Sequence, residues 1–533
     1  MISSVRRALL AASFSCAFAC SAGAQNYQDL IKPNPNNWLH YNGTYDSQRH
    51  SLLKQIDTGN VANLKAEWIY HMTGAVDLEA VPIVVDGVMY ISQWNRVEAL
   101  DARTGRLIWQ YMRQPFTKGW QRGVAVYNGK IYIGTVDSAL IALDAKTGNL
   151  IWESKTVGEG YRMLGAAPLI AKGKVIVGGS GKSGGWVQAF DAETGKYAWT
   201  WNVIPKPGEK GVETWEGDSW KLGGGPIWAT GSFDAELNIL YWGTGQPGVD
   251  FVGEIRPGDN LFTDCIVALD IDTGKMKWYF QNTPHDVHDW DSEETPVLID
   301  AMFKGQMRKL LIQANRNGYF YILDRTNGKF LQGTPFVSQL TWSRGLTEDG
   351  RPIVVAGSAP TVEGSRVCPS TAGATNWPSP AYSPDTKLFY LVVQEGCGIT
   401  YKASNNFTAG QSGSGTGYIE SPIDQENWQL HVRALDLTGK TVWSYKQVSS
   451  KHYGPGLLST AGGVLFAGEQ QGQFTALDST TGKVLWHFNT GGLITAGPST
   501  YSVNGKQYVV IGSYANYIAF ALPDAVIRDA AAK

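Results

Sequence analysis

The stretch Ala99-Leu-Asp-Ala-Arg-Thr-Gly-Arg-Leu-Ile-Trp109 decides the fold, because it recurs in varied form along most of the chain. In each copy a small and an apolar residue end one strand, and the following Asp accepts backbone N–H bonds in a turn. Gly then supplies the positive φ of that turn, and Trp opens the next strand with a large flat face. The other copies are Ala142 to Trp152, Ala189 to Trp199, Ala268 to Trp278, Ile322 to Gly328, Ala434 to Trp443, Ala476 to Trp486 and the worn Asp57 to Trp68.

Eight copies predict eight small sheets, and the early copies lie about 43 to 47 residues apart, which suits four short strands in each sheet. One such sheet cannot bury both of its faces alone, and a closed ring of sheets also limits the exposed edges. We therefore predict an all-β chain folded as an eight-bladed β-propeller, with the strand Gln507–Gly512 closing the ring against N-terminal sequence. The longer gap between Gly328 and Ala434 predicts insertions that build a cap or a pocket on one face.

The N-terminus has the pattern of a secretory signal. Arg6 and Arg7 precede an apolar stretch, Ala8–Ala19, and the small residues Ala22-Gly-Ala24 form a cleavage site. We predict a signal peptide over residues 1–24 and a single exported domain over residues 25–533. Cys20 raises the alternative of a lipoprotein, although the residues before it match the lipidation consensus poorly. No later apolar run reaches the ~18 residues of a membrane helix, so we expect no stable membrane insertion.

Charge and cysteine content narrow the classes of partner. Loss of the signal brings the net charge from −2 to −4, which offers no electrostatic footprint for nucleic acid and leaves small molecules or proteins as partners. Cys265, Cys368 and Cys397 remain, and one disulfide with one free thiol is the simplest arrangement. No Cys-x-x-Cys-His sequence occurs, so we expect no c-type haem on this chain and an external electron acceptor for any redox chemistry.

The tryptophan-bearing repeat resembles the docking motif of the methanol and ethanol dehydrogenases that depend on pyrroloquinoline quinone (PQQ). Propellers without catalytic activity, including outer-membrane assembly lipoproteins, carry similar repeats, so function has to come from site residues. Four further stretches look like the central block of the dehydrogenase family. They are Trp215 to Trp228, Tyr241 to Gly245, Thr283 to Asp291 and Asn315 to Arg325.

The resemblance implies a set of residues around the cofactor. Trp228 would form the floor on which the PQQ rings stack, and Arg122 would pair with a cofactor carboxylate. Glu79 and Ser180 fall at positions of further polar contacts, and Gln394 replaces an Asn near the cofactor. The alternatives are a Trp228 that only packs between blades and ordinary loop residues at positions 79 and 180.

The resemblance also implies catalytic and metal-binding residues. Asp289 matches the general base that takes the hydroxyl proton while hydride passes to quinone C5, and Arg316 matches the cation beside the quinone oxygens. The alternative for Asp289 is a turn-capping role in a loop rich in Asp. Gln246 replaces an Asn metal ligand, and Asp291 is an extra acid found in relatives that use lanthanides. We therefore expect Gln246, Asp289 and Asp291 to hold Ca²⁺ or a lanthanide ion.

Two departures from the family pattern stand out. The adjacent-cysteine pair that covers PQQ in many relatives is missing from Gln114–Gln121, so Phe116 or Trp120 would roof the cofactor instead. The Glu metal ligand is also missing, because Gly178–Trp186 contains no carboxylate. Lys182 in that segment opens the alternative of an ammonium in place of the metal, although we favour a retained metal because a divalent ion polarises a carbonyl more strongly.

Two further assignments concern histidines and cysteines. His285 and His288 raise the alternative of a zinc site, but a third strong ligand is not evident. The family has a disulfide where Cys368 and Cys397 stand, which leaves Cys265 as a thiol on a buried strand.

The expected function is that of a periplasmic PQQ-dependent dehydrogenase, which oxidises a primary alcohol, secondary alcohol or polyol and passes electrons to a cytochrome c. The alternative is a cofactor-free propeller that serves as a binding scaffold.

Overall fold

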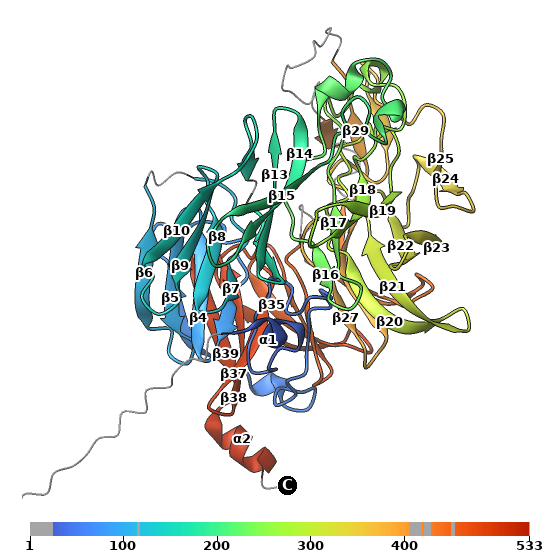
Figure 1. Ribbon diagram of the computed structural model, residues 1–533. Helices are drawn as coiled ribbons and strands as arrows, with labels where there is room; N and C mark the ends of the chain where they lie inside the picture. The colour runs from blue at the N-terminus through green and yellow to red at the C-terminus, as the bar shows by residue number, and fades with distance from the viewer. Residues whose placement is uncertain are drawn as a thin grey trace, which may run out of the picture.

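The computed structural model describes residues 25–114, 118–163, 165–403, 418–420, 428–448 and 454–531. Eight small sheets of these residues follow one another around a ring, two smaller sheets are formed by insertion strands, and helices are few (Figure 1). This arrangement confirms the predicted all-β, eight-bladed β-propeller. The predicted signal peptide over residues 1–24 lies outside the described residues.

Blades 1 to 4 are antiparallel sheets whose strands follow each other in chain order, with the first, short strand of each blade largely buried. Their strands are β3 (Ile83–Val85), β4 (Val88–Gln93), β5 (Arg96–Asp101), β6 (Leu107–Met112); β7 (Ala125–Tyr127), β8 (Lys130–Gly134), β9 (Ala139–Asp144), β10 (Leu150–Lys155); β12 (Leu169–Ala171), β13 (Lys174–Gly181), β14 (Gly184–Asp191), β15 (Tyr197–Asn202), with β11 (Arg162–Met163) also paired to β13; and β16 (Ser232–Asp234), β17 (Ile239–Gly243), β18 (Cys265–Asp270), β19 (Met276–Gln281).

Blades 5 to 8 repeat this plan, and the last one combines strands from both ends of the chain. Their strands are β20 (Val297–Phe303), β21 (Gln306–Ala314), β22 (Tyr319–Asp324), β23 (Lys329–Pro335); β27 (Ala381–Ser383), β28 (Leu388–Glu395), β31 (Gln429–Leu435), β32 (Thr441–Lys446); β33 (Leu458–Thr460), β34 (Val464–Gly468), β35 (Gln473–Asp478), β36 (Val484–Asn489), with β1 (His50–Ser51) parallel to β33; and β37 (Ser499–Val503), β38 (Lys506–Ser513), β39 (Asn516–Ala521), β2 (Lys65–His71).

The ring is closed by pairing between the two ends of the chain. β2 pairs antiparallel with β39, so that Trp68 stands opposite Ala519. The predicted closure is therefore confirmed, but the predicted closing strand, Gln507–Gly512, belongs to β38 and is the neighbour of the strand that meets β2. The prediction missed β39, which is joined to β38 by a short turn after Ser513.

The repeated turn explains how one blade fits the next. Asp101 Oδ1 accepts the backbone N–H groups of Arg103 and Thr104 at 2.9 and 3.1 Å, and Gly105 has a φ of +71°. A Cβ atom at Gly105 would lie 2.7 Å from the Trp68 ring, so only glycine lets that ring pack on the turn. The Trp68 indole N–H also donates to Ala102 O at 3.1 Å.

The same donor geometry recurs from blade to blade, with each indole N–H donating to the residue after the turn Asp of the next copy. The pairs are Trp109 to Ala145, Trp152 to Ala192, Trp199 to Ile271, Trp278 to Arg325 and Trp443 to Ser479. The copy at Ile322–Gly328 has Gln332 at the position of the Trp, and Gln332 Nε2 donates to the equivalent acceptor, Leu437 O, at 3.4 Å.

The insertion strands and the two α-helices lie at opposite ends of the molecule (Figure 1). The insertion strands are β24 (Ser343–Leu346), β25 (Pro352–Val354), β26 (Ser365–Val367), β29 (Gly398–Thr400) and β30 (Tyr418–Glu420). The helices are α1 (Tyr27–Ile31), α2 (Asp524–Ala531) and the 3₁₀ turns η1 (Val61–Asn63), η2 (Val212–Thr214), η3 (Ser219–Leu222) and η4 (Gly253–Ile255). Figure 1 shows β24, β25 and β29 at the upper side of the molecule, away from α1 and α2, as expected for a cap on one face.

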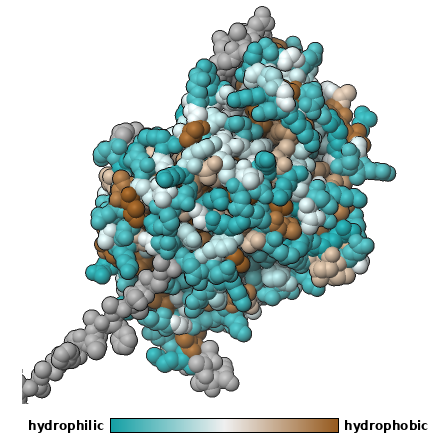
Figure 2. Space-filling view, in the orientation of Figure 1, coloured by the Kyte–Doolittle hydropathy of each residue, from teal (hydrophilic) through white to brown (hydrophobic). Residues whose placement is uncertain are grey.

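The surface in the same orientation is largely hydrophilic, with hydrophobic residues in small separate groups (Figure 2). No helix in the described ranges has the length and apolar character needed to cross a membrane.

Candidate active site

The loop between β19 and β20 carries the proposed base. Asp286 stabilises the conformation of this loop, because its carboxylate accepts hydrogen bonds from the backbone N–H groups of His288 at 3.0 Å and Trp290 at 2.9 Å. Asp289 lies between these two bonds with a φ of +61°, a left-handed conformation that Asp tolerates better than most residues. Its side chain remains 28% exposed, whereas Asp286 and Trp290 are buried. The loop therefore presents one carboxylate and buries its neighbours.

Arg316 stands directly against this loop from the turn after β21. Its Nη1 donates to Asp291 Oδ2 at 2.7 Å, and its Nη2 lies 4.0 Å from Asp289 Oδ2. The guanidinium is buried. The structure thus brings together Asp289, Asp291 and Arg316, which the sequence singled out separately.

The surroundings of Asp289 raise the pKa of its carboxyl group. Burial raises the pKa of this carboxyl well above its ordinary value, Arg316 lowers the pKa, and the nearby charges of Asp291, Asp250 and Asp286 raise it further. Burial likewise raises the pKa of Asp291, against the influence of Arg316. A carboxyl with raised proton affinity next to a cation is suited to accept a proton from a substrate hydroxyl.

Gln246 lies beside the same cluster and supplies an oxygen atom. Its backbone N–H donates to Asp291 Oδ1 at 3.0 Å, and its amide hydrogen-bonds to Asp250. The side-chain oxygen of Gln246 is buried without a hydrogen-bond partner among the described residues. An orphaned amide oxygen next to two carboxylates is a hard-oxygen donor set, which fits Ca²⁺ or a lanthanide ion.

The donor set is incomplete on the protein side. Within the described part of the chain, no three His, Cys, Asp or Glu side chains converge to hold a metal ion. A cation at Gln246, Asp289 and Asp291 would therefore need further oxygen atoms from a cofactor or from water.

Lys182 does not occupy the place of the missing Glu ligand. Its side chain is 71% exposed, and its ammonium pairs with Glu159 Oε1 at 2.9 Å on the surface. The alternative in which Lys182 replaces the metal therefore has no support from this geometry. The sequence could not reveal this, because β13 and β14 form a long hairpin whose tip carries Lys182 outward.

A second cluster forms around Arg122. The guanidinium lies between two indole rings, 5.1 Å from the centroid of Trp228 and 4.7 Å from that of Trp377. Arg122 Nη1 donates to Trp228 O at 3.0 Å, and Nη2 lies 3.5 Å from Glu79 Oε2. The structure thus brings Arg122, Trp228 and Glu79 together. Ser180 makes no hydrogen bond with them in the described contacts, but the residue before it, Gly179, accepts a hydrogen bond at 3.1 Å from the N–H of Ile227, the residue before Trp228.

Trp228 also connects the two clusters. Its indole hydrogen-bonds to the carboxylate of Asp291, whereas its backbone carbonyl holds Arg122. The half-buried ring is therefore placed between the proposed catalytic residues and the proposed carboxylate-binding arginine. This position differs from that of the indoles that bond across blade boundaries, and it speaks against the alternative of a packing role alone.

The remaining predicted cofactor contacts are placed as follows. Gln394 is buried, and its Nε2 has no hydrogen-bond partner among the described residues. Phe116 lies outside the described residues. Trp120 is 68% exposed and lines a cleft of about 490 Å³ together with Glu79, Trp94 and Lys118. Of the two residues proposed to cover the cofactor, Trp120 therefore lines the same cleft as Glu79, the partner of Arg122.

Two residues of the site were missed from the sequence. Trp377 lies in the stretch Gly373–Trp377, which contains a turn signal but no sign that its last residue covers Arg122. Asp250 was also missed. Burial raises its pKa to about 6, and Gln246 lowers it through a hydrogen bond.

The histidines do not form a metal site. His285 Nδ1 lies 2.8 Å from Gly258 O, and His288 is buried against the Trp290 ring at a centroid distance of 4.4 Å. Burial lowers the pKa of His288 to about 3, which keeps it neutral. Because no third ligand joins them in the described ranges, the zinc alternative has no support.

The predicted cysteine arrangement is confirmed. Cys368 and Cys397 form a disulfide, and Cys265 is a buried free thiol on β18 whose pKa is raised by burial.

Comparison with known proteins identifies the family of the chain. The family model "PQQ: Glucose/ethanol/alcohol dehydrogenase, beta-propeller domain" matches residues 38–335 and 425–509. The quinoprotein alcohol dehydrogenase PedH of Pseudomonas putida is 36% identical over 96% of this chain and 93% of that protein. A quinohemoprotein alcohol dehydrogenase of Comamonas testosteroni is 37% identical over 91% of this chain and 74% of that protein.

Solved structures give the same result. The quinohemoprotein alcohol dehydrogenase ADHIIG of Pseudomonas putida HK5 superposes with a TM-score of 0.88 at 33% identity, covering 94% of this chain and 82% of that one. A europium-containing methanol dehydrogenase gives a TM-score of 0.82 at 30% identity, covering 93% of this chain and all of that one. The chain therefore belongs to the family of PQQ-dependent alcohol dehydrogenases and is a quinoprotein oxidoreductase.

Proposed function

We propose that the protein oxidises an alcohol to its carbonyl compound in the periplasm, with Asp289 as general base, and passes the electrons to an external cytochrome c. The observation that carries the proposal is the contact of Arg316 with both Asp289 and Asp291, one indole away from Arg122. Membership of an enzyme family and this cluster together speak against the scaffold alternative.

Asp289 and Arg316 have complementary roles in this proposal. The half-buried Asp289 carboxylate takes the hydroxyl proton of the alcohol. Arg316 places a fixed positive charge where negative charge develops during the transfer. Bound PQQ would supply the ortho-quinone that accepts the hydride.

Arg122 is proposed to anchor the cofactor. A planar guanidinium pairs well with a carboxylate, and the rings of Trp228 and Trp377 hold it in one orientation. Trp228 would also stack on the PQQ rings, and Glu79, Ser180 and Gln394 would supply polar contacts.

Replacing Arg122 with Ala is expected to weaken PQQ binding by about 10- to 100-fold, because it deletes a charge-assisted pair worth roughly 1.5–3 kcal/mol. The measurement is a PQQ titration of the apoprotein, followed by the change in tryptophan fluorescence. Arg113→Ala is the control, since Arg113 also makes several carboxylate contacts, but with Asp137 and Glu153, which are not among the proposed cofactor contacts. An Arg122→Ala protein with unchanged PQQ affinity would remove Arg122 from this role.

The proposed metal ligands are Gln246, Asp289 and Asp291, with Ca²⁺ or a lanthanide as the ion. When bound, such an ion acts as a Lewis acid toward a carbonyl oxygen. Exhaustive chelation is therefore expected to remove most of the activity, and calcium or lanthanum is expected to restore it. Lys182→Met should leave the response unchanged, because Lys182 pairs with Glu159 on the surface. Full activity of the chelated protein in a metal-free assay would contradict a metal requirement.

The acceptor and the substrate are proposals of their own. The 533 residues contain no Cys-x-x-Cys-His sequence, which supports a separate cytochrome c as acceptor. Reduction of a periplasmic cytochrome c by the alcohol-reduced protein tests this. A panel of primary alcohols, secondary alcohols and polyols, read with a phenazine dye, defines the substrate class.

A further inference from the structure

A short strap of small residues, Ser370–Ala374, runs between the disulfide and the proposed catalytic cluster. It begins two residues after Cys368 and contains no large side chain. Gly373 has a φ of +84°, and a Cβ atom there would lie 2.7 Å from the Cβ and Cγ of Arg316. The backbone of the strap therefore packs directly against the Arg316 side chain, with no room for a side chain at position 373.

Arg316 is held by this strap at two points. Its Nη2 donates to Thr371 O at 2.7 Å, and its backbone carbonyl accepts the N–H of Ala374 at 2.8 Å. The guanidinium thus has the strap on one side and Asp291 on the other. A shift of Thr371 O would directly change where Nη2 lies relative to Asp289.

The same strap holds the loop of the proposed base. The Trp290 indole N–H donates to Ser370 O at 2.9 Å, and Trp290 is the residue between Asp289 and Asp291. Trp290 is fully buried and packs edge-on against Trp342 at 5.0 Å. Adjacent carbonyl groups of the strap therefore receive a bond from the base loop and a bond from the arginine.

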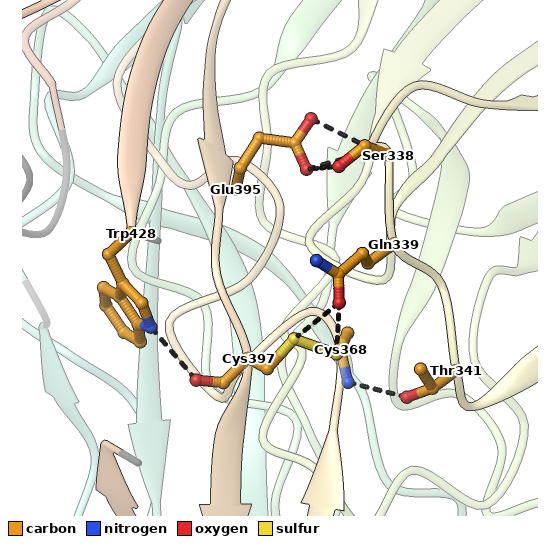
Figure 3. The surroundings of a disulfide bond; sticks show 7 residues. All are labelled: Ser338, Gln339, Thr341, Cys368, Glu395, Cys397 and Trp428. Atoms are coloured by element: carbon orange, nitrogen blue, oxygen red, sulfur yellow. Dashed lines mark hydrogen bonds between the residues drawn. A yellow bond between two sulfur atoms is a disulfide. The ribbon is translucent and has the colours of Figure 1, made fainter. Parts of the chain in front are cut away.

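The disulfide ties this strap to the end of β28 (Figure 3). Cys368 is bonded to Cys397. In the strap itself, Ser370 N donates to Gly396 O at 3.1 Å. On the other side, Cys368 N donates to Thr341 Oγ1 at 2.8 Å and Cys368 O accepts the N–H of Thr341 at 2.9 Å. Because small residues bury little surface, the covalent link and these few bonds fix the strap.

We propose that the Cys368–Cys397 disulfide is a positioning element for the reaction, which holds Ser370 and Thr371 so that Arg316 and the Asp289 loop keep their mutual geometry. The inference rests on the proposed roles of Asp289 and Arg316. The disulfide touches no reacting atom and acts through the strap. A misplacement of about 1 Å at a catalytic group can cost about 100-fold in rate.

The first test removes the disulfide and asks whether the loss passes through Arg316. The double variant Cys368→Ala/Cys397→Ala is expected to lower kcat by about 10- to 100-fold, with PQQ affinity and the alcohol KM little changed. In an Arg316→Lys background the same two substitutions should cause almost no further loss, because the geometry they protect is already gone. Cys265→Ala is the matched control and should leave kcat unchanged, since Cys265 forms no disulfide and no side-chain bond to the strap in the described contacts.

Two further variants act on the strap and leave the disulfide intact. Trp290→Phe keeps an aromatic ring but deletes the donor to Ser370 O, and Gly373→Ala pushes a methyl group against Arg316. Both are expected to lower kcat more than they raise KM. They keep the inference testable if the double cysteine variant does not fold.

Hydrogen–deuterium exchange tests the strap directly and needs neither PQQ nor catalytic activity. Hydrogen–deuterium exchange of the wild-type apoprotein, with and without reduction, should show faster exchange at Ser370–Ala374, where the Ala374 N–H is bonded to Arg316 O. The turn at Asp101–Gly105 serves as an internal reference that should not change. This measurement holds even if Asp289 or Arg316 has another role, so it separates failure of the inference from failure of the proposed function.

Three results would overturn the inference. One is a disulfide-free protein with wild-type kcat. Another is an equal loss of kcat on removing the disulfide in the wild-type and Arg316→Lys backgrounds, which would indicate a general loss of stability. The third is unchanged exchange of the strap on reduction.

Discussion

Asp289→Asn is expected to lower kcat for alcohol oxidation by about 10²- to 10⁴-fold while PQQ affinity changes little. The amide cannot accept the hydroxyl proton, and it has almost the same shape as the carboxylate. Asn also tolerates the left-handed backbone at this position, where φ is +61°, so the loop should keep its conformation. Dye reduction under saturating alcohol and PQQ, with calcium in excess, gives kcat, and a PQQ titration gives the affinity.

The matched control is the same chemical change at a surface carboxylate. Asp218 is 74% exposed and pairs only with Lys221 in the described contacts, so Asp218→Asn should behave as wild type. If Asp289→Asn retained most of the wild-type kcat, Asp289 would not be the base, and the turn-capping alternative would be favoured.

Arg316→Lys is expected to lower kcat by about 10²- to 10³-fold, as for loss of a preorganised electrostatic contact. The guanidinium reaches Asp291 Oδ2 and Thr371 O, both at 2.7 Å, while standing 4.0 Å from Asp289 Oδ2. A lysine ammonium keeps the charge but cannot satisfy two acceptors in this fork geometry. The same dye assay measures the effect, and thermal unfolding checks that the fold is retained.

Arg325→Lys is the control for this substitution. Arg325 is also buried, and it donates to Asp234 Oδ2 at 2.7 Å and Ile299 O at 2.8 Å, between blades 4 and 5. It should affect stability more than kcat. If Arg316→Lys lowered the midpoint of unfolding but left kcat unchanged, Arg316 would have a structural role only.

The fold could be predicted from the sequence because its key contacts repeat. In each copy Asp accepts hydrogen bonds from the turn N–H groups, and Gly leaves space for the Trp ring of the preceding copy, so the same residue types mark the contact between neighbouring blades. The closing hairpin at β39 lacks the repeat, and for that reason the closing strand was placed one strand too early.

The site was predictable only in part. Resemblance to the family predicted roles for Asp289, Arg316, Arg122 and Trp228, which stand in four different connecting segments and meet only in the folded ring. The direction of a side chain was not predictable where no motif fixes it. Lys182 points to solvent because of the length of its hairpin, and Trp377 reaches Arg122 because the strap before it is held in place.

The pairing of β2 with β39 has a consequence for biosynthesis. β2 comes before blade 1 in the chain and β39 comes after blade 7, so β2 is made well before its partner. Until then the nascent chain carries an open sheet edge at each end of an incomplete ring, and such edges pair readily with other chains. A chain that ended just before Asn516 would therefore keep two complementary unpaired edges, on β2 and β38, which favours association between molecules over closure within one.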